Sequence, residues 1–161
     1  MKYLYIWRFQ PFHLGHLDAI HQAIAKWATH IMIGLGSANT INEDNPWTAQ
    51  DRESMIRDSL AESWIDQEVY SFELLPDFST DLERYNYIID SLPTFDVVMS
   101  WNPWVKDIFD SCTHTVFDPE IQSKVNIHAT HIREWIRAGE IDKISKYLCP
   151  WVLEYVLNTM S

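Results

Sequence analysis

The sequence predicts an α/β fold, in which a doubly wound parallel sheet is followed by C-terminal helices, in one domain over residues 1–161. Three observations predict this class. Two short apolar runs, residues 2–7 and 31–36, enclose an amphipathic segment over residues 14–27. A strand, a helix and a strand of these lengths imply a right-handed parallel crossover. The chain length also fits one domain with a core of its own.

The first half of the chain predicts two inner strands and two helices. Residues 2–7 are apolar on both faces, which is typical of a central strand. Residues 31–36 form a second buried strand that ends in glycines, and Thr48 suits the N-cap of a helix that runs through Leu60. The helix over residues 14–27 packs an apolar face on the sheet, formed by Leu17, Ile20, Ala23, Ile24 and Trp27.

The second half continues the alternation with shorter elements. Strands are expected at residues 69–74, 95–99 and 114–117, with a strand or an extended link at 124–127. Helices are expected at residues 80–92, 102–109, 128–134, 141–148 and 151–157. Thr80 or Ser79 suits the cap of the first of these helices, and Asn102 or Ser100 suits the cap of the second. In the terminal helices, Leu148, Trp151 and Val152 are available to cover the sheet or a partner subunit.

The composition excludes several classes of protein. Hydrophobic residues make up 47% of the chain and aromatic residues 14%, which excludes a disordered chain. The formal net charge of −11 argues against a nucleic-acid partner, because a phosphate backbone requires a basic face. No apolar run approaches the roughly 20 residues that span a bilayer, so we expect no membrane partner.

The start of the chain and its cysteines indicate a compartment. Met1 and Lys2 lead directly into a strand rather than into a signal peptide. Cys112 and Cys149 are too few and too isolated for a disulfide framework or a zinc site, which fits a reduced, cytoplasmic protein. The eight tryptophans suggest apolar surface that a homo-oligomer would cover.

Residues 8–16 contain the strongest candidate site. Pro11 suits a turn between strand and helix, and Gly15 allows the backbone to approach a ligand closely. His13 and His16 are three residues apart, so they share one face of a first helical turn, where unpaired amides favour a phosphate. The alternative is that they are a helix start and a solvated surface residue.

The same stretch is similar to the R-F-Q-P-F-H-x-G-H signature of the nucleotidyltransferase superfamily, particularly the archaeal-type nicotinamide mononucleotide adenylyltransferases. Three further blocks resemble this family in the same order. They are residues 36–38 with 45–52, residues 100–103, and residues 130–133. The resemblance covers residues 3–140 and implies a Rossmann-like nucleotidyltransferase fold.

This resemblance implies an enzyme that moves AMP from ATP to nicotinamide mononucleotide, which yields NAD and pyrophosphate. The implied catalytic residues are His13, His16 and Arg52. The implied ATP- and phosphate-binding residues are Arg8, Phe9, Gly15, Ser100, Asn102, Thr130 and Arg133. The implied acceptor-binding residues are Ser37, Asp81 and Tyr85. Mg²⁺ is expected to enter with ATP, without an all-protein metal site.

Three of the positions that depart from the family pattern leave the acceptor and the shape of the cleft open. Trp7 and Trp101 stand where relatives have glycine, and Asp81 stands where they have asparagine. The two indoles either reshape the nucleotide cleft or point away from the ligand. Asp81 and Tyr85 either contact the acceptor base or belong to the surface and the core.

Two other functions therefore stay open. One keeps the ATP site and changes the acceptor, for example to phosphopantetheine, FMN or a sugar or alcohol phosphate. The other is a nucleotide-binding protein without catalysis. Within the first interpretation, the choice between nicotinamide and nicotinate mononucleotide also stays open.

Overall fold

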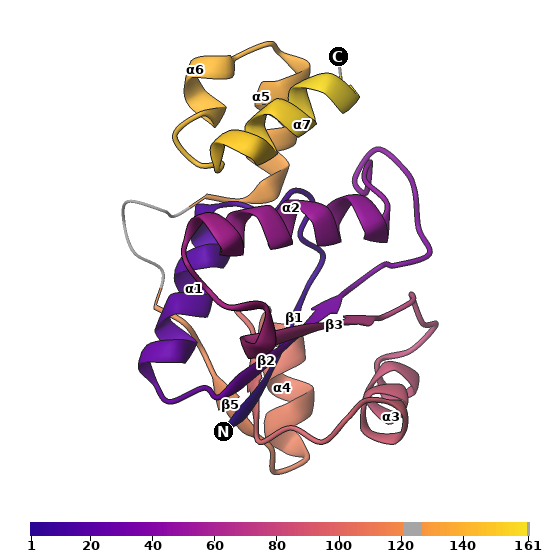
Figure 1. The fold of residues 1–161 in the computed structure, drawn as a ribbon. Coiled ribbons are helices and arrows are strands. Elements are labelled where there is room, and N and C mark those ends of the chain that lie inside the picture. The colour runs from indigo at the N-terminus through magenta and orange to yellow at the C-terminus, as the bar shows by residue number, and fades with distance from the viewer. Residues whose placement is uncertain (121–126, 161) are drawn as a thin grey trace.

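A computed structural model describes residues 1–120 and 127–160 of the chain (Figure 1). Its five parallel strands are β1 (Lys2–Trp7), β2 (His30–Leu35), β3 (Tyr70–Leu74), β4 (Val97–Met99) and β5 (Thr115–Phe117). The helices are α1 (Leu14–Ala25), α2 (Ala49–Glu62), the 3₁₀ turn η1 (Gln67–Val69), α3 (Asp81–Ser91), α4 (Pro103–Ser111), α5 (Ala129–Arg137), α6 (Ile141–Ile144) and α7 (Pro150–Met160).

The order of the strands in the sheet is β3-β2-β1-β4-β5. Tyr3 of β1 pairs with Ile31 on one side and with Val97 on the other, which confirms that β1 is central. The chain first moves outward from β1 to β3 and then returns to β4 beside β1. The strand order therefore reverses between β1 and β4, as in a doubly wound sheet, and ligands of such sheets bind at the carboxyl ends of the strands near the reversal.

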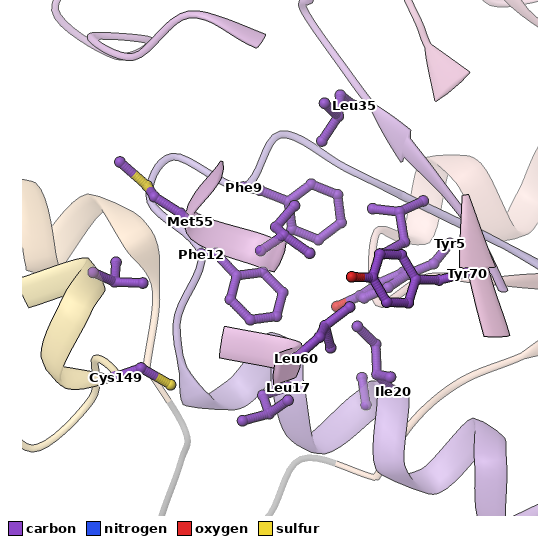
Figure 2. Close-up of a cluster of buried hydrophobic side chains, with 14 of the residues drawn as sticks. Tyr5, Phe9, Phe12, Leu17, Ile20, Leu35, Met55, Leu60, Tyr70 and Cys149 are labelled. Atoms are coloured by element: carbon purple, nitrogen blue, oxygen red, sulfur yellow. The ribbon is translucent and has the colours of Figure 1, made fainter. Parts of the chain in front are cut away.

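The two faces of the sheet are covered by different helices. Tyr3 and Tyr5 belong to a buried cluster with residues of α1, α2 and the C-terminal helices, whereas Leu4 and Ile6 pack with residues of α3 and α4. This alternation follows from the two-residue period of a strand. Figure 2 shows the ring of Phe9 in the larger cluster, close to the centre of the view.

The C-terminal helices form a further layer beyond α2 (Figure 1). Leu148 and Val152 are buried in the larger cluster, while Trp151 is 60% exposed, so this tryptophan does not cover the sheet. Tyr155 Oη donates a hydrogen bond to Asp51 Oδ1 at 2.6 Å. Because Asp51 also completes the capping box of α2 with Thr48, this bond joins α7 to the start of α2.

Several details differ from the sequence predictions. The first helix ends at Ala25, and Trp27 is 82% exposed in a left-handed conformation (φ 69°), because the chain turns after the helix without a glycine. Strand β4 begins at Val97 rather than at residue 95, and α6 ends at Ile144. The link expected at 124–127 falls largely outside the described residues. In the described part of the chain, each helix is too short or too polar to cross a membrane.

We predict that Tyr155→Phe loosens the attachment of α7. Loss of a hydrogen bond to a partly exposed carboxylate should lower the free energy of unfolding by about 1–2 kcal/mol. Urea denaturation of the variant measures this change, and Tyr147→Phe is the control, since its hydroxyl makes no hydrogen bond with a described residue. Equal stability of Tyr155→Phe and the unaltered chain would contradict the predicted attachment.

Candidate active site

The turn between β1 and α1 is held by buried side chains. Gln10 Nε2 donates to the carbonyl of Trp47 at 2.8 Å, and Trp47 N donates to Gln10 Oε1 at 3.1 Å. Phe9 adopts a left-handed backbone (φ 52°) with its ring fully buried. Of the predicted ATP-binding residues, Phe9 can therefore offer a ligand its backbone but not its ring.

His13 and His16 form one stacked pair at the start of α1. Their ring centroids are 3.7 Å apart. Gly15 N donates to His13 Nδ1 at 3.1 Å, and His13 N donates to His16 Nδ1 at 3.2 Å. Because both Nδ1 atoms accept, we assign the ring protons to the two Nε2 atoms. His13 is the N-cap of the helix, so the prediction that the two residues share its first turn is confirmed.

Burial keeps both imidazoles neutral. It is the main cause that lowers the pKa of His13 to about 3, and the charge of His128 adds to the effect. Burial, followed by the charge of His13, lowers the pKa of His16 well below 6.5. His16 Nε2 is buried without a hydrogen-bond partner among the described residues. An N–H donor left in this state would gain from a phosphate oxygen.

Arg52 lies beneath the site and binds backbone carbonyls. Its guanidinium donates to Arg8 O at 2.6 Å, to Gly36 O at 2.7 Å and to Ser37 O at 3.3 Å, and its Nε donates to Thr48 O at 3.2 Å. The side chain is fully buried, and burial is the main cause that lowers its pKa to about 10. Four of the five N–H groups of Arg52 are thus engaged, so its observed contacts hold the ends of β1 and β2 together.

Arg133 similarly attaches α5 to the turn. Its Nη1 donates to Gln10 O at 2.7 Å, and its Nη2 lies 3.4 Å from both Asp44 Oδ1 and Thr130 Oγ1. Arg133 Nε is buried without a partner in the described residues. Thr130 itself lies in the exposed first turn of α5. The structure therefore brings the Thr130 block beside the histidine turn, from more than a hundred residues away.

A cavity of about 220 Å³ opens at the carboxyl ends of β1, β2 and β3. Its lining comprises Ile6, Trp7, Arg8, Gly36, Ser37, Leu75, Pro76, Asp77, Arg84, Asn102, Trp104 and Val105. Drug-sized ligands usually occupy roughly 300–1,000 Å³, so this cavity has room for one nucleotide at most. Three of the predicted site residues, Arg8, Ser37 and Asn102, line it.

Two further predicted site residues, Ser100 and Asp81, contact residues of the lining, while Gly15 belongs to the histidine turn. Ser100 is fully buried, and its Oγ accepts from Asn102 N at 3.1 Å, while Asn102 caps α4 as predicted. Gly15 is buried in α1, where its N–H binds His13. Asp81 accepts a hydrogen bond from the indole N–H of Trp104.

Tyr85 is not brought into the cavity. Its hydroxyl lies 3.0 Å from His114 Nε2, and its ring packs edge-on against Phe109. The neighbouring residue on α3, Arg84, lines the cavity together with Trp104. Adjacent residues of a helix point about 100° apart, so α3 cannot direct both Tyr85 and Arg84 into the cavity, and the sequence pattern did not show which of the two faces it.

Trp7 and Trp101 lie beside the histidines. Their rings meet edge to face with centroids 5.9 Å apart, and each lies close to the ring of His16, at 6.1 Å and 6.2 Å. The indole N–H of Trp101 donates to Pro119 O at 2.6 Å. Trp7 also lines the cavity, whereas Trp101 packs beside Trp7 and His16 without belonging to that lining.

The neutral imidazoles lie at the helix start that follows the first strand of a parallel sheet, which is a common place for phosphate sites in α/β proteins. The model of the cytidylyltransferase-like family matches residues 4–135. Nicotinamide-nucleotide adenylyltransferase of Methanolobus tindarius is 36% identical over 137 residues, which cover 84% of this chain and 77% of the relative. The chain therefore belongs to the cytidylyltransferase-like family and, within it, to the nicotinamide-nucleotide adenylyltransferases.

Two further comparisons agree. The nicotinamide-nucleotide adenylyltransferase of Saccharolobus solfataricus is 32% identical over 155 residues, which cover 96% of this chain and 89% of the relative. Among solved structures, a bifunctional NMN adenylyltransferase/ADP ribose pyrophosphatase from Francisella tularensis, complexed with AMP and a manganese ion, has a TM-score of 0.70 and 25% identity. The match covers 86% of this chain and 42% of the Francisella chain, so this chain spans less than half of that protein.

We predict that the histidine pair stays neutral far below the usual range. In a proton NMR titration of the chain without ligand, the ring signals of His13 should shift only near its folded pKa of about 3, and those of His16 should also titrate well below 6.5. Because the unfolded chain takes up these protons at higher pH than the folded chain does, the stability contributed by the neutral pair should be lost as pH falls below about 6.5. Titration of both rings near pH 6.5 would contradict the buried assignment.

We also predict that Trp101→Gly exposes His16. Since burial is the main cause of the low pKa of His16, removal of the adjacent indole should raise that pKa toward 6.5, which the same NMR titration measures. Trp64→Gly is the matched control, because Trp64 is 95% exposed. An unchanged pKa of His16 in Trp101→Gly would show that the indole does not cover it.

Proposed function

We propose that this chain, acting as one nucleotidyltransferase unit, transfers AMP from ATP to nicotinamide mononucleotide and releases NAD and pyrophosphate. The observation that carries the proposal is the stacked pair of His13 and His16. Both imidazoles are neutral, their Nδ1 atoms accept backbone N–H groups at the start of α1, and their Nε2 atoms are left as donors. The names of the relatives support the choice of reaction and acceptor.

In the proposed reaction, an oxygen of the acceptor phosphate attacks the α-phosphorus of ATP. A new P–O bond forms, the bond between the α-phosphorus and the bridging oxygen breaks, and pyrophosphate leaves with that oxygen. The histidine pair would donate Nε2 hydrogen bonds to the oxygens on which charge builds up. Because the protein does no covalent chemistry in such a step, its contribution is positioning and electrostatic stabilisation.

The arginines would divide the remaining work. Arg8 is exposed, lines the cavity and can reach a phosphate, whereas Arg52 would act from beneath by holding the turn and offering at most one free N–H. Arg133, Thr130 and the amides at the start of α5 would receive the β- and γ-phosphates. Phe9, Gly15, Ser100 and Asn102 would shape the ATP side of the site, and Ser37 the acceptor side.

Mg²⁺ is proposed to arrive with the triphosphate and to neutralise part of its charge. Within the described residues, no three His, Cys, Asp or Glu side chains converge on a point where they could hold a metal. The ligands of the ion would then be phosphate oxygens and water, which Mg²⁺ commonly retains.

The setting of the reaction is also proposed. The substrates are small molecules, and the net charge of −11 supports an enzyme that works without nucleic acid. The isolated cysteines Cys112 and Cys149 support a cytoplasmic setting, and the short apolar runs of the sequence support work without a membrane. A homo-oligomer stays a prediction from the tryptophan content.

The test is formation of NAD from ATP, Mg²⁺ and nicotinamide mononucleotide, identified by chromatography beside phosphopantetheine, FMN and sugar phosphates as acceptors. We expect His16→Ala to lower kcat/KM by roughly 10²–10³-fold, because it removes a donor from the transition state. His21→Ala, an exposed histidine on the same helix, is the control and should keep normal activity.

The outcomes separate the interpretations. Near-normal turnover by His16→Ala would refute the assigned role of the pair. Product formed only with a different acceptor would support the adenylyl transfer but assign another substrate to it. Tight ATP binding without pyrophosphate release would favour a nucleotide-binding protein without catalysis.

A further inference from the structure

Three charged side chains line the cavity, namely Arg8, Asp77 and Arg84. Asp77 is already engaged, because Ser37 Oγ donates to one of its oxygens at 2.8 Å and Thr40 Oγ1 donates to the other at 2.5 Å. The guanidinium groups of Arg8 and Arg84 make no hydrogen bond or ion pair with a residue in the described ranges 1–120 and 127–160. The charged groups of the cavity that lack such a partner are thus both cationic N–H donors, which suit an anionic ligand.

Arg84 is oriented by its neighbours. Its guanidinium carbon lies 4.3 Å from the ring centroid of Trp104, within the range of a cation–π contact. The indole is oriented in turn, because its N–H donates to Asp81. A guanidinium stacked on an aromatic ring keeps the edges of its planar fork free, and these edges match the two oxygens of a carboxylate.

The two free arginines come from different elements. Arg8 follows β1 directly and lies next to the histidine turn, while Arg84 is on α3 and stacks on the first turn of α4. In the proposed reaction, the acceptor phosphate must lie near the histidines. The phosphate therefore belongs at the Arg8 end, and the pyridine ring belongs toward Arg84 and Trp104.

The charge of the ring substituent then decides what Arg84 can bind. Nicotinamide mononucleotide has a cationic pyridinium ring with a neutral amide, so its ring end offers Arg84 a carbonyl oxygen and a repelling charge. Nicotinate mononucleotide has a carboxylate on the same ring. A carboxylate can accept two N–H groups of one guanidinium and compensates the pyridinium charge.

We propose that Arg84 binds the ring carboxylate of nicotinate mononucleotide and thereby admits this acid as a second acceptor beside the amide. The inference rests on the proposed adenylyl transfer. Asp77 lies close to both arginines and offsets part of their charge. With both its oxygens held by hydroxyl groups, it keeps the cavity from becoming a general anion site while leaving the Arg84 donors free.

The experiment measures kcat/KM for both acceptors, with ATP and Mg²⁺, in the unaltered chain and in Arg84→Gln, Arg84→Lys and Arg57→Gln. Arg57→Gln is the matched control, because it removes the same charge from α2, where Arg57 pairs with Glu53 away from the cavity. The unaltered chain should convert both acceptors. The ratio of kcat/KM for the acid to kcat/KM for the amide should fall by about tenfold or more in Arg84→Gln, less in Arg84→Lys, and not in Arg57→Gln.

The failures can be told apart. If the unaltered chain makes NAD but no nicotinate adenine dinucleotide, or if Arg84→Gln and Arg57→Gln give the same ratio as the unaltered chain, this inference is wrong and the proposed function stands. If neither dinucleotide forms in the unaltered chain, both are wrong. Circular dichroism checks that each variant is folded, and Arg84→Lys supplies the ratio if Arg84→Gln is not.

Discussion

The site depends on one buried cation, the guanidinium of Arg52. It comes from α2 and binds the carbonyls of Arg8 and Gly36, which are the residues that leave the two central strands. Such carbonyls have no ladder partner once the strands have ended, and an unsatisfied buried carbonyl is costly. Arg52 therefore satisfies the strand ends and sets the separation between the histidine turn and the loop at Ser37. The family resemblance places Arg52 among the catalytic groups, but its contacts in the structure hold the ends of the two strands together.

The arginines of the site fall into two groups with different surroundings. Arg52 and Arg133 are buried and donate to the backbone of the loops that they join. Arg8 and Arg84 face the cavity, and their guanidinium groups have no hydrogen-bond or ion-pair partner among the described residues. In a chain with a net charge of −11, these four cations give a local field opposite in sign to that of the molecule as a whole. An anionic substrate would gain from that field only near the strand ends, where the cations gather.

The sequence predicted the features of the fold that local chemistry determines. The central position of β1 follows from its apolar run, and the caps at Thr48, Thr80 and Asn102 follow from side chains that can bind the first helical amides. Features that depend on distant partners could not be predicted in this way. The direction of the Tyr85 side chain depends on its contacts with Phe109 and His114. The exposure of Trp27 depends on a turn that the chain makes after the first helix without a glycine. Arg84 and Trp104 were missed because their stacking joins two helices that share no sequence pattern.

The stacked histidines also have a consequence for how this chain tolerates change. Each Nδ1 atom accepts a backbone N–H at the start of α1, and this bond leaves the proton of each ring on Nε2. Each imidazole thus caps the start of a helix with Nδ1, and the same bond determines that the donor proton is on its Nε2. A replacement that kept the donor but lost the bond to the helix start would weaken the fold. A replacement that kept this bond but had no second N–H would lose the donor. At these two positions, the same side chain must both cap the helix and donate from Nε2. Fewer residue types can therefore replace His13 or His16 than the helix cap alone, or the donor alone, would allow.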